Sequence, residues 1–177
     1  SSEVAEECVG NFVMENVARL YTRLNGQTRN EIIECFKSLG YVVEAKVVCA
    51  SDYGVPQNRY RVLFIGKKTD NANYEIIFPA KSTKPAPTIK DAIGKYPPLE
   101  SGESSDIANH EAMVHSQQMI EKMSYVKDGG GRDDIPEEIR PQKGDIRKYI
   151  RYDSTKPSIC ITGDMRKVFH YSQNRAL

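Results

Sequence analysis

The sequence lacks several patterns that would assign it to a class directly. No two of its four cysteines form a C-x-x-C pair, so it predicts neither a zinc site nor a redox-active pair. No apolar run approaches membrane-spanning length, and the first residues carry no signal-peptide pattern. The loop Gly129-Gly130-Gly131-Arg132 does not match the G-x-x-x-x-G-K-[ST] pattern that cradles a phosphate. We therefore expect a metal-free cytoplasmic protein that makes no contact with a membrane.

The residues that are present are typical of a soluble globular protein. Hydrophobic residues make up 39% of the sequence and charged residues 28%, and a length of 177 residues is enough for one domain, or one domain with a small appendage. The cysteines stand among apolar neighbours, so we expect buried thiols. They are Cys8, Cys35, Cys49 and Cys160.

Charge is unevenly distributed along the chain. The segment 140–177 holds nine Lys or Arg and three Asp, a net charge of +6, and the whole chain carries +1, which leaves −5 for the rest. A basic segment beside a mildly acidic body indicates a polyanionic partner. The alternative is a solvated basic tail without a partner.

The order of the apolar runs predicts half of a layered α/β sheet. Runs at 12–15, 41–48 and 60–66 are short and rich in strand-forming residues. The third run, closed by Gly66, is typical of a parallel strand that is covered on both faces. The link between the second and third runs is too short for a helical crossover, however, which favours antiparallel neighbours for these two.

Capping patterns predict where the helices begin. Thr28 and Glu31 match a T-x-x-E capping box before an apolar helical stripe, and Thr88 and Ser116 precede two further short helices. A strand is expected at 74–78, followed by a proline-rich linker.

Charged side chains stand at the ends of the first and third runs. Glu15 closes the first run, and ligands of open α/β sheets bind at such strand ends. Arg59 and Arg61 lie two residues apart, so in an extended chain they point the same way. Two guanidinium groups there suit an anionic ligand or a paired carboxylate. A surface ion pair at a strand end is the alternative interpretation.

Taken together, these motifs resemble the cytosine-5 DNA methyltransferase family. The resemblance rests on Glu15-Asn16-Val17, followed by Tyr53-Gly54-Val55-Pro56 and then Gln57-Asn58-Arg59-Tyr60-Arg61. It extends to a C-terminal block with Pro157-Ser158, Ile161-Thr162, His170 and Arg175. It implies an α/β fold, a partial Rossmann-like methyltransferase sheet with a small, mixed target-recognition domain. The implied divisions are 1–66 for the second half of the catalytic domain, 67–146 for target recognition and 147–177 for a C-terminal return segment.

The resemblance also implies chemistry for individual residues. In the family, the glutamate that matches Glu15 holds a flipped cytosine, and the arginine that matches Arg61 contacts the base and that glutamate. Arg59 is expected beside the site and the DNA backbone, while Asn16 and Gln57 are expected to support the site structurally. The reaction that the resemblance implies is methylation of cytosine C5 with S-adenosylmethionine as cofactor.

Duplex DNA is the implied partner. The residues expected to contact it are basic, or stand in the C-terminal block. They are Arg132, Arg147, Lys148, Arg151, Arg166, Lys167, His170 and Arg175.

Two parts of the family pattern have no counterpart in the sequence. No cysteine follows a proline, and the Gly-rich motif that receives S-adenosylmethionine is missing. Cys49 and Cys160 do not replace the nucleophile, because apolar neighbours raise a thiol pKa. We expect the C-terminal-side portion of a methyltransferase, inactive alone, whose partner is the missing N-terminal half of the catalytic domain. A companion restriction endonuclease is a further candidate partner.

Three alternatives remain open at this point. A non-catalytic DNA-binding module would use the same basic residues and would not need Glu15. A relative acting on RNA, such as tRNA, would use a similar scaffold. A small-molecule enzyme with a nucleotide-binding fold is the weakest alternative, because the sequence has no Gly-rich cofactor loop.

Overall fold

Three strands form the sheet that positions the predicted catalytic residues. They are β1 (Asn11–Val17), β2 (Tyr41–Cys49) and β4 (Tyr60–Lys68), in the order β1-β4-β2. The central strand β4 runs antiparallel to both neighbours, which confirms the expected β2–β4 pairing. The parallel surroundings expected for the run at 60–66 are therefore wrong. The computed structural model describes residues 10–143, 148–162, 165 and 168–176.

This sheet belongs to the first of two compact units. The first unit comprises residues 1–53 and 59–84, and the second comprises residues 54–58 and 85–177. These two units are defined by which residues lie close together in space, and not by function. The functional boundaries expected at residues 66 and 146 stay predictions.

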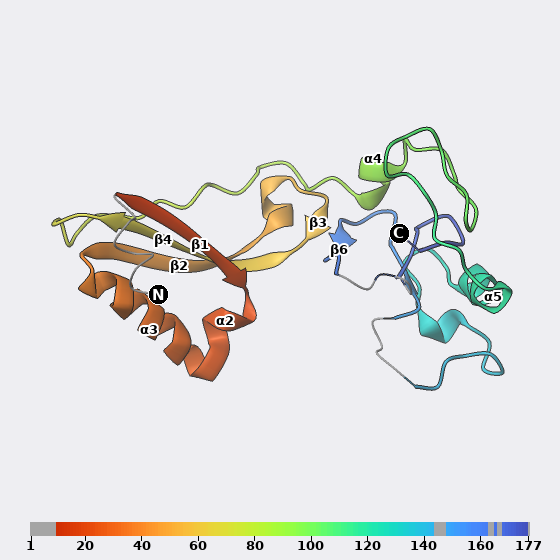
Figure 1. Ribbon diagram of the computed structural model, residues 1–177, viewed down its shortest axis with the longest axis horizontal. Helices are drawn as coiled ribbons and strands as arrows, with labels where there is room; N and C mark the ends of the chain where they lie inside the picture. The colour runs from red at the N-terminus through yellow and green to blue at the C-terminus, as the bar shows by residue number, and fades with distance from the viewer. Residues whose placement is uncertain (1–9, 144–147, 163–164, 166–167, 177) are drawn as a thin grey trace. The chain divides into compact units, whose positions relative to one another are not determined.

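One face of the three-stranded sheet is covered by a helix. Helix α3 (Gln27–Ser38) runs along this face in Figure 1, and Val62 and Phe64 of β4 are fully buried beneath it. The Phe12 ring stacks on Phe36 of the helix with ring centroids 4.1 Å apart. Alternate β4 residues therefore form the core, as the twofold period of a strand requires.

Helix α3 does not begin with the capping box expected at Thr28. It follows a short helix α2 (Arg19–Thr22) and a 3-10 turn (Arg23–Gly26), and its N-cap is Gly26 in a left-handed conformation with φ of 88°. No side chain caps this N-terminus. The prediction is wrong because the Asn25-Gly26 turn starts the helix earlier in the chain.

The segment after β4 returns past the 3-10 helix Ala50–Tyr53 without forming a strand. Lys81 pairs with Asp52 at 2.7 Å, and the Ser82 N–H donates to the Asp52 carbonyl. Residues 74–78 make no strand pairing among the described residues, so the expected strand is wrong. Ile76 is nevertheless buried, and Lys46 of β2 lies over the Phe78 ring.

The second unit contains short elements joined by long loops. Its helices are α4 (Ile89–Ile93) and α5 (Gln117–Tyr125), and a 3-10 helix covers Arg132–Asp134. Parallel pairs join β3 (Gln57–Asn58) to β6 (Ser158–Ile159) and β5 (Ile150–Arg151) to β7 (Val168–Phe169). The expected caps are confirmed, because the hydroxyls of Thr88 and Ser116 accept from the backbone N–H groups of Asp91 and Met119.

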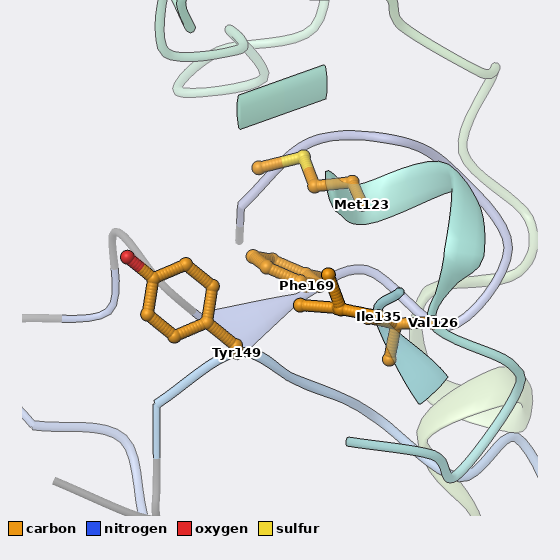
Figure 2. Close-up of a cluster of buried hydrophobic side chains, with 5 residues drawn as sticks. All are labelled: Met123, Val126, Ile135, Tyr149 and Phe169. Carbon is orange, nitrogen blue, oxygen red and sulfur yellow. The ribbon is translucent and has the colours of Figure 1, made fainter. Parts of the chain in front are cut away.

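Buried side chains from distant segments form the core of this unit. Figure 2 shows them gathered around the Phe169 ring. The Tyr149 ring meets Phe169 edge-on, with ring centroids 6.3 Å apart. The inward position expected for the α5 methionines is confirmed at Met123, which is fully buried. The cluster consists of Met123, Val126, Ile135, Tyr149 and Phe169.

Candidate functional site

Strand pairing brings Glu15 and Arg61 together. Glu15 of β1 lies opposite Leu63, and Arg61 of β4 lies opposite Val17. Diagonal neighbours two residues apart on one face of a sheet are within reach of long side chains. The Arg61 Nε lies 2.6 Å from Glu15 Oε1, which is a short charge-assisted pair.

This ion pair is open to solvent on its acidic side. The Glu15 side chain is 52% exposed, whereas that of Arg61 is 20% exposed. The Arg61 Nη1 also donates to the carbonyl of Tyr60 at 2.7 Å, which fixes the guanidinium near the backbone of its own strand. The strand extends to Val17, so Glu15 stands near the end of β1 rather than at its last residue. A ligand with a hydrogen-bond donor can therefore approach the carboxylate, while the arginine stays held.

The residues after Glu15 line a cavity of about 550 Å³ in the first unit. The Asn16 side-chain oxygen accepts from the Val17 N–H at 2.8 Å, in agreement with a local structural role for this amide. Arg19 and Arg23 also line the cavity, and no carboxylate does so among the described residues. Both arginines are exposed, so the described lining of this hollow carries positive charge and no negative charge.

The other two motif residues have separate surroundings. The Arg59 carbonyl accepts from the Ala50 N–H at 2.9 Å, closing the loop that precedes β4, and its side chain is half-buried. Gln57 belongs to the second unit, where it pairs with Ser158 in the β3–β6 ladder. The structure thus joins Glu15 to Arg61 directly and gives Gln57 a backbone role in the second unit.

Arg151 is buried and fully engaged with the protein. Only 7% of the residue is exposed, and all five guanidinium N–H groups donate to oxygens of this chain. Four of the acceptors are backbone carbonyls, and the fifth is the Asn174 side chain. This geometry contradicts the prediction that Arg151 binds DNA, since no donor is left for a phosphate.

His170 and Arg175 also differ from the exposed contacts expected for a basic segment. They are 2% and 6% exposed, respectively, and both line a small cavity of the second unit. Burial, followed by the nearby charges of Arg175 and Arg151, lowers the pKa of His170 to about 4, so its ring is neutral at pH 7.

Comparison with known proteins places these motifs in a family. A sequence profile described as C-5 cytosine-specific DNA methylase matches residues 10–177. The chain belongs to this family. The Type II methyltransferase M1.HphI of Haemophilus parahaemolyticus is 62% identical over 166 residues, covering 94% of this chain and 44% of that protein. M.DdeI of Desulfomicrobium norvegicum is 30% identical over 160 residues, covering 75% of this chain and 39% of that protein.

Structural comparison agrees on the fold. A crystal structure of a proposed DNA modification methyltransferase encoded within an E. coli prophage matches with a TM-score of 0.68 at 20% identity. The match covers 98% of this chain and 57% of that one. The chain therefore has a mixed α/β fold like that of Rossmann-type methyltransferases, and it spans less than half the length of the two curated methylase relatives named above.

The remaining residues that the methylase resemblance assigned to DNA binding fall into two groups. Arg132 and Lys148 are half-buried in the second unit. Arg147, Arg166 and Lys167 lie outside the described residues. No helix of the described part of this methylase chain is long and apolar enough to cross a membrane.

The cysteines of this methylase chain are placed differently from one another. Cys49 is buried, with its sulfur 3.1 Å from the Ser51 hydroxyl, and Cys160 is half-buried. Cys35 is exposed on α3, so its expected burial is wrong, and Cys8 lies outside the described residues. The wrong expectation came from apolar neighbours in sequence, which on a helix face different directions.

Sequence reasoning missed three residues that line cavities of this methylase chain, namely Arg19, Arg23 and His110. Arg19 and Arg23 are four residues apart, and residues at this spacing lie on the same side of a helix. This spacing could have indicated that both face the same hollow after Glu15. His110 lines a cavity with His170 and Arg175, and no spacing pattern connects residues so far apart in the sequence. Only the fold brings these three together.

Proposed function

We propose that this chain is the cytosine-holding part of a DNA (cytosine-5) methyltransferase, with Glu15 and Arg61 as the pair that receives the flipped base. The observation that supports this is the 2.6 Å ion pair between them, whose carboxylate side is exposed to solvent. One Glu15 oxygen bonds to Arg61, and the other can accept from the exocyclic amine of cytosine.

The charge of Arg61 gives this arrangement a catalytic effect. Attack at C6 makes the cytosine ring electron-rich, and a cation beside its polar edge stabilises the charge that develops. Arg61 is held before substrate arrives by Glu15 and by the carbonyl of Tyr60, so little reorganisation is needed during the reaction. Arg59 is assigned to the DNA backbone beside the site. Asn16 supports the backbone after Glu15 through its bond to the Val17 N–H, and Gln57 supports the β3–β6 pairing of the second unit.

The described residues do not fit S-adenosylmethionine by themselves. The hollow beside Glu15 is lined by Arg19 and Arg23, which would repel the sulfonium, and no described lining residue offers a carboxylate for its ribose hydroxyls. We therefore assign the cofactor and the cysteine nucleophile to the rest of the protein.

The partners follow from the same proposal. Duplex DNA is the substrate, with Arg132 and Lys148 as described residues that contact its backbone. The protein works beside the DNA in the bacterial cytoplasm. A restriction endonuclease of the same specificity is the companion that we propose, and the naming of the relatives as Type II methyltransferases supports it.

Methyl transfer from labelled S-adenosylmethionine to mixed-sequence duplex DNA tests the proposal. The chain is assayed alone and then in a complex with the part of M1.HphI that lies outside the match, with complex formation checked by size-exclusion chromatography. We expect no methyl transfer by the chain alone and measurable methyl transfer by the complex. Activity of the chain alone, or its covalent trapping on 5-fluorocytosine DNA, would contradict the assignment of the nucleophile and the cofactor site to the rest of the protein. An inactive complex of correct size would contradict the proposal itself.

A variant pair then assigns the role of Glu15. Glu15→Gln in the complex is expected to lower kcat about 100-fold or more, in the range seen when a transition-state contact is removed. Glu44→Gln is the control, because Glu44 is exposed on β2 of the same sheet and forms no ion pair among the described residues. Equal activity of the two variants would exclude Glu15 from the reaction. Assaying tRNA beside DNA determines which nucleic acid is the substrate.

A further inference from the structure

A second polar cavity lies in the second unit, away from the Glu15 motif in sequence. Its volume is about 200 Å³. Its lining includes buried His170 and Arg175, half-buried His110 and exposed Glu111. The buried residues carry hydrogen-bond donors, and the exposed residues leave the cavity accessible from solvent.

Arg175 is a buried cation without a counter-ion in the described part of the chain. Its Nε donates to the Gln173 side-chain oxygen at 2.6 Å, and its Nη1 donates to the Ala176 carbonyl at 3.2 Å. Among the described residues, its Nη2 makes no hydrogen bond and no carboxylate lies within ion-pair distance. Burying an uncompensated guanidinium destabilises a fold, so its presence in a cavity points to an anion that binds there.

Two histidines add donors to the same cavity. The Ser172 N–H donates to Nδ1 of His170 at 3.2 Å, which places the proton of the neutral ring on Nε2. His110 Nδ1 lies 2.8 Å from the Ser105 hydroxyl, and its ring is tilted against Tyr96. Neither Nε2 has a partner among the described residues. The cavity therefore gathers one cationic donor and the Nε2–H of His170, and His110 Nε2 is a further donor in the tautomer whose Nδ1 accepts from the Ser105 hydroxyl.

The combination of donors selects the class of ligand. A cation would be repelled by Arg175, and an apolar group would leave the donors unpaired. A tetrahedral oxyanion offers several acceptor oxygens to donors that converge from different directions, and arginine is suited to phosphate in this way. Glu111 is the one carboxylate among the described lining residues, and it is exposed rather than paired with Arg175.

We propose that this cavity binds a phosphate-type oxyanion, with Arg175 supplying the charge and His110 and His170 supplying hydrogen bonds. The ligand is either a backbone phosphate of DNA or free inorganic phosphate. The inference does not depend on methyl transfer. Its test is binding to this chain alone, so failure of the proposed reaction and failure of this site are distinguishable.

The test is a titration of the ¹⁵N-labelled full chain with inorganic phosphate at constant ionic strength, followed by NMR. Saturable shifts of the Arg175 Nε–H signal are expected. Arg175→Gln should weaken binding about tenfold or more, and Arg175→Lys should weaken it less, since a point charge remains without the planar fork. Lys127→Gln, which removes an exposed charge outside the cavity, should leave binding within about twofold.

A second variant keeps the test decisive if Arg175→Gln does not fold. Glu111→Gln alters only an exposed side chain and removes a repulsive charge, so it should tighten phosphate binding about two- to fivefold. Unchanged binding in the Glu111 variant, together with no loss in any folded Arg175 variant, would overturn the proposal.

Measuring duplex DNA binding by the same variants distinguishes a DNA backbone phosphate from free phosphate as the ligand. If the cavity receives a backbone phosphate, Arg175→Lys and Glu111→Gln change DNA affinity in the same direction as phosphate affinity, and phosphate competes with DNA. If it receives free phosphate, both variants alter phosphate binding and leave DNA affinity unchanged. Either result supports an oxyanion site, whereas saturable binding of neither ligand at Arg175 contradicts it.

Discussion

At the scale of single residues, Arg151 joins segments of the second unit that are far apart in sequence. Its guanidinium donates to the carbonyls of Met123 and Val126 on one side and of His170 and Gln173 on the other. A planar group with five fixed donors suits this arrangement, and a lysine ammonium cannot reproduce it.

Replacing Arg151 by Met is therefore expected to lower the free energy of unfolding by about 3 to 5 kcal/mol, because buried carbonyls lose their partners. Arg151→Lys should lose nearly as much. Chemical denaturation measures both, with Lys127→Met as an exposed control that is expected to change stability by less than about 0.5 kcal/mol. A near-neutral Arg151→Met variant would mean that the guanidinium does not hold these loops together.

His170 gives the second unit a pH-dependent stability. Folding lowers the pKa of His170 from 6.5 to about 4, chiefly through burial. Between these values the unfolded chain binds a proton on this ring and the folded chain does not. The contribution of His170 to stability should therefore be constant above about pH 7 and fall as the pH drops from about 6.5 to 4, by an amount on the order of 2 to 3 kcal/mol.

The measurement compares denaturation midpoints of the wild type and His170→Gln across this pH range. Other acids and His115 titrate in both proteins, so the difference between the two curves isolates His170. We expect the variant to show a shallower acid-side decline. Parallel curves would show that the ring of His170 titrates normally in the folded chain.

At the scale of elements, the helix N-termini offer a matched pair of threonines. Thr88 and Asp91 form a complete capping box on α4, whereas Thr28 caps nothing because α3 starts from Gly26. Thr88→Ala should cost about 1 kcal/mol of stability, and Thr28→Ala should cost less than about 0.5 kcal/mol. Thermal unfolding of the two variants gives the comparison, and a larger loss at Thr28 would contradict the cap assignment.

Some helices and strands could be predicted from local sequence patterns, and others could not. The strand runs, the caps at Thr88 and Ser116 and the β2–β4 pairing all follow from spacing and short-range chemistry. The start of α3 did not, because a left-handed turn ending at Gly26 competes with the T-x-x-E pattern two residues later. The strand expected at 74–78 failed because a strand needs a partner, and pairing is not a local property.

At the scale of the whole molecule, the uneven charge predicts a steep salt dependence of DNA binding. Each phosphate contact made by a cation releases counterions, so the logarithm of the binding constant should fall linearly with that of the salt concentration. Lys148→Gln should lower the magnitude of this slope by about 1, and Lys127→Gln should leave it unchanged if only the former contacts DNA. Fluorescence anisotropy with labelled duplex between about 50 and 200 mM salt measures it. A flat response would rule out backbone contacts by the basic segment.

The sequence by itself determined the motif order and with it the family, and it named the two residues that we propose hold the base. Glu15 and Arg61 are recognisable because strand ends, arginine spacing and flanking turns are local features. Only the tertiary structure decided that these two form an ion pair, since their contact depends on the register between β1 and β4. It also decided that Arg151, His170 and Arg175 are buried. Their burial depends on packing between segments far apart in sequence, such as residues 123–126 and 168–176, and charge counted along a chain contains no information about that packing.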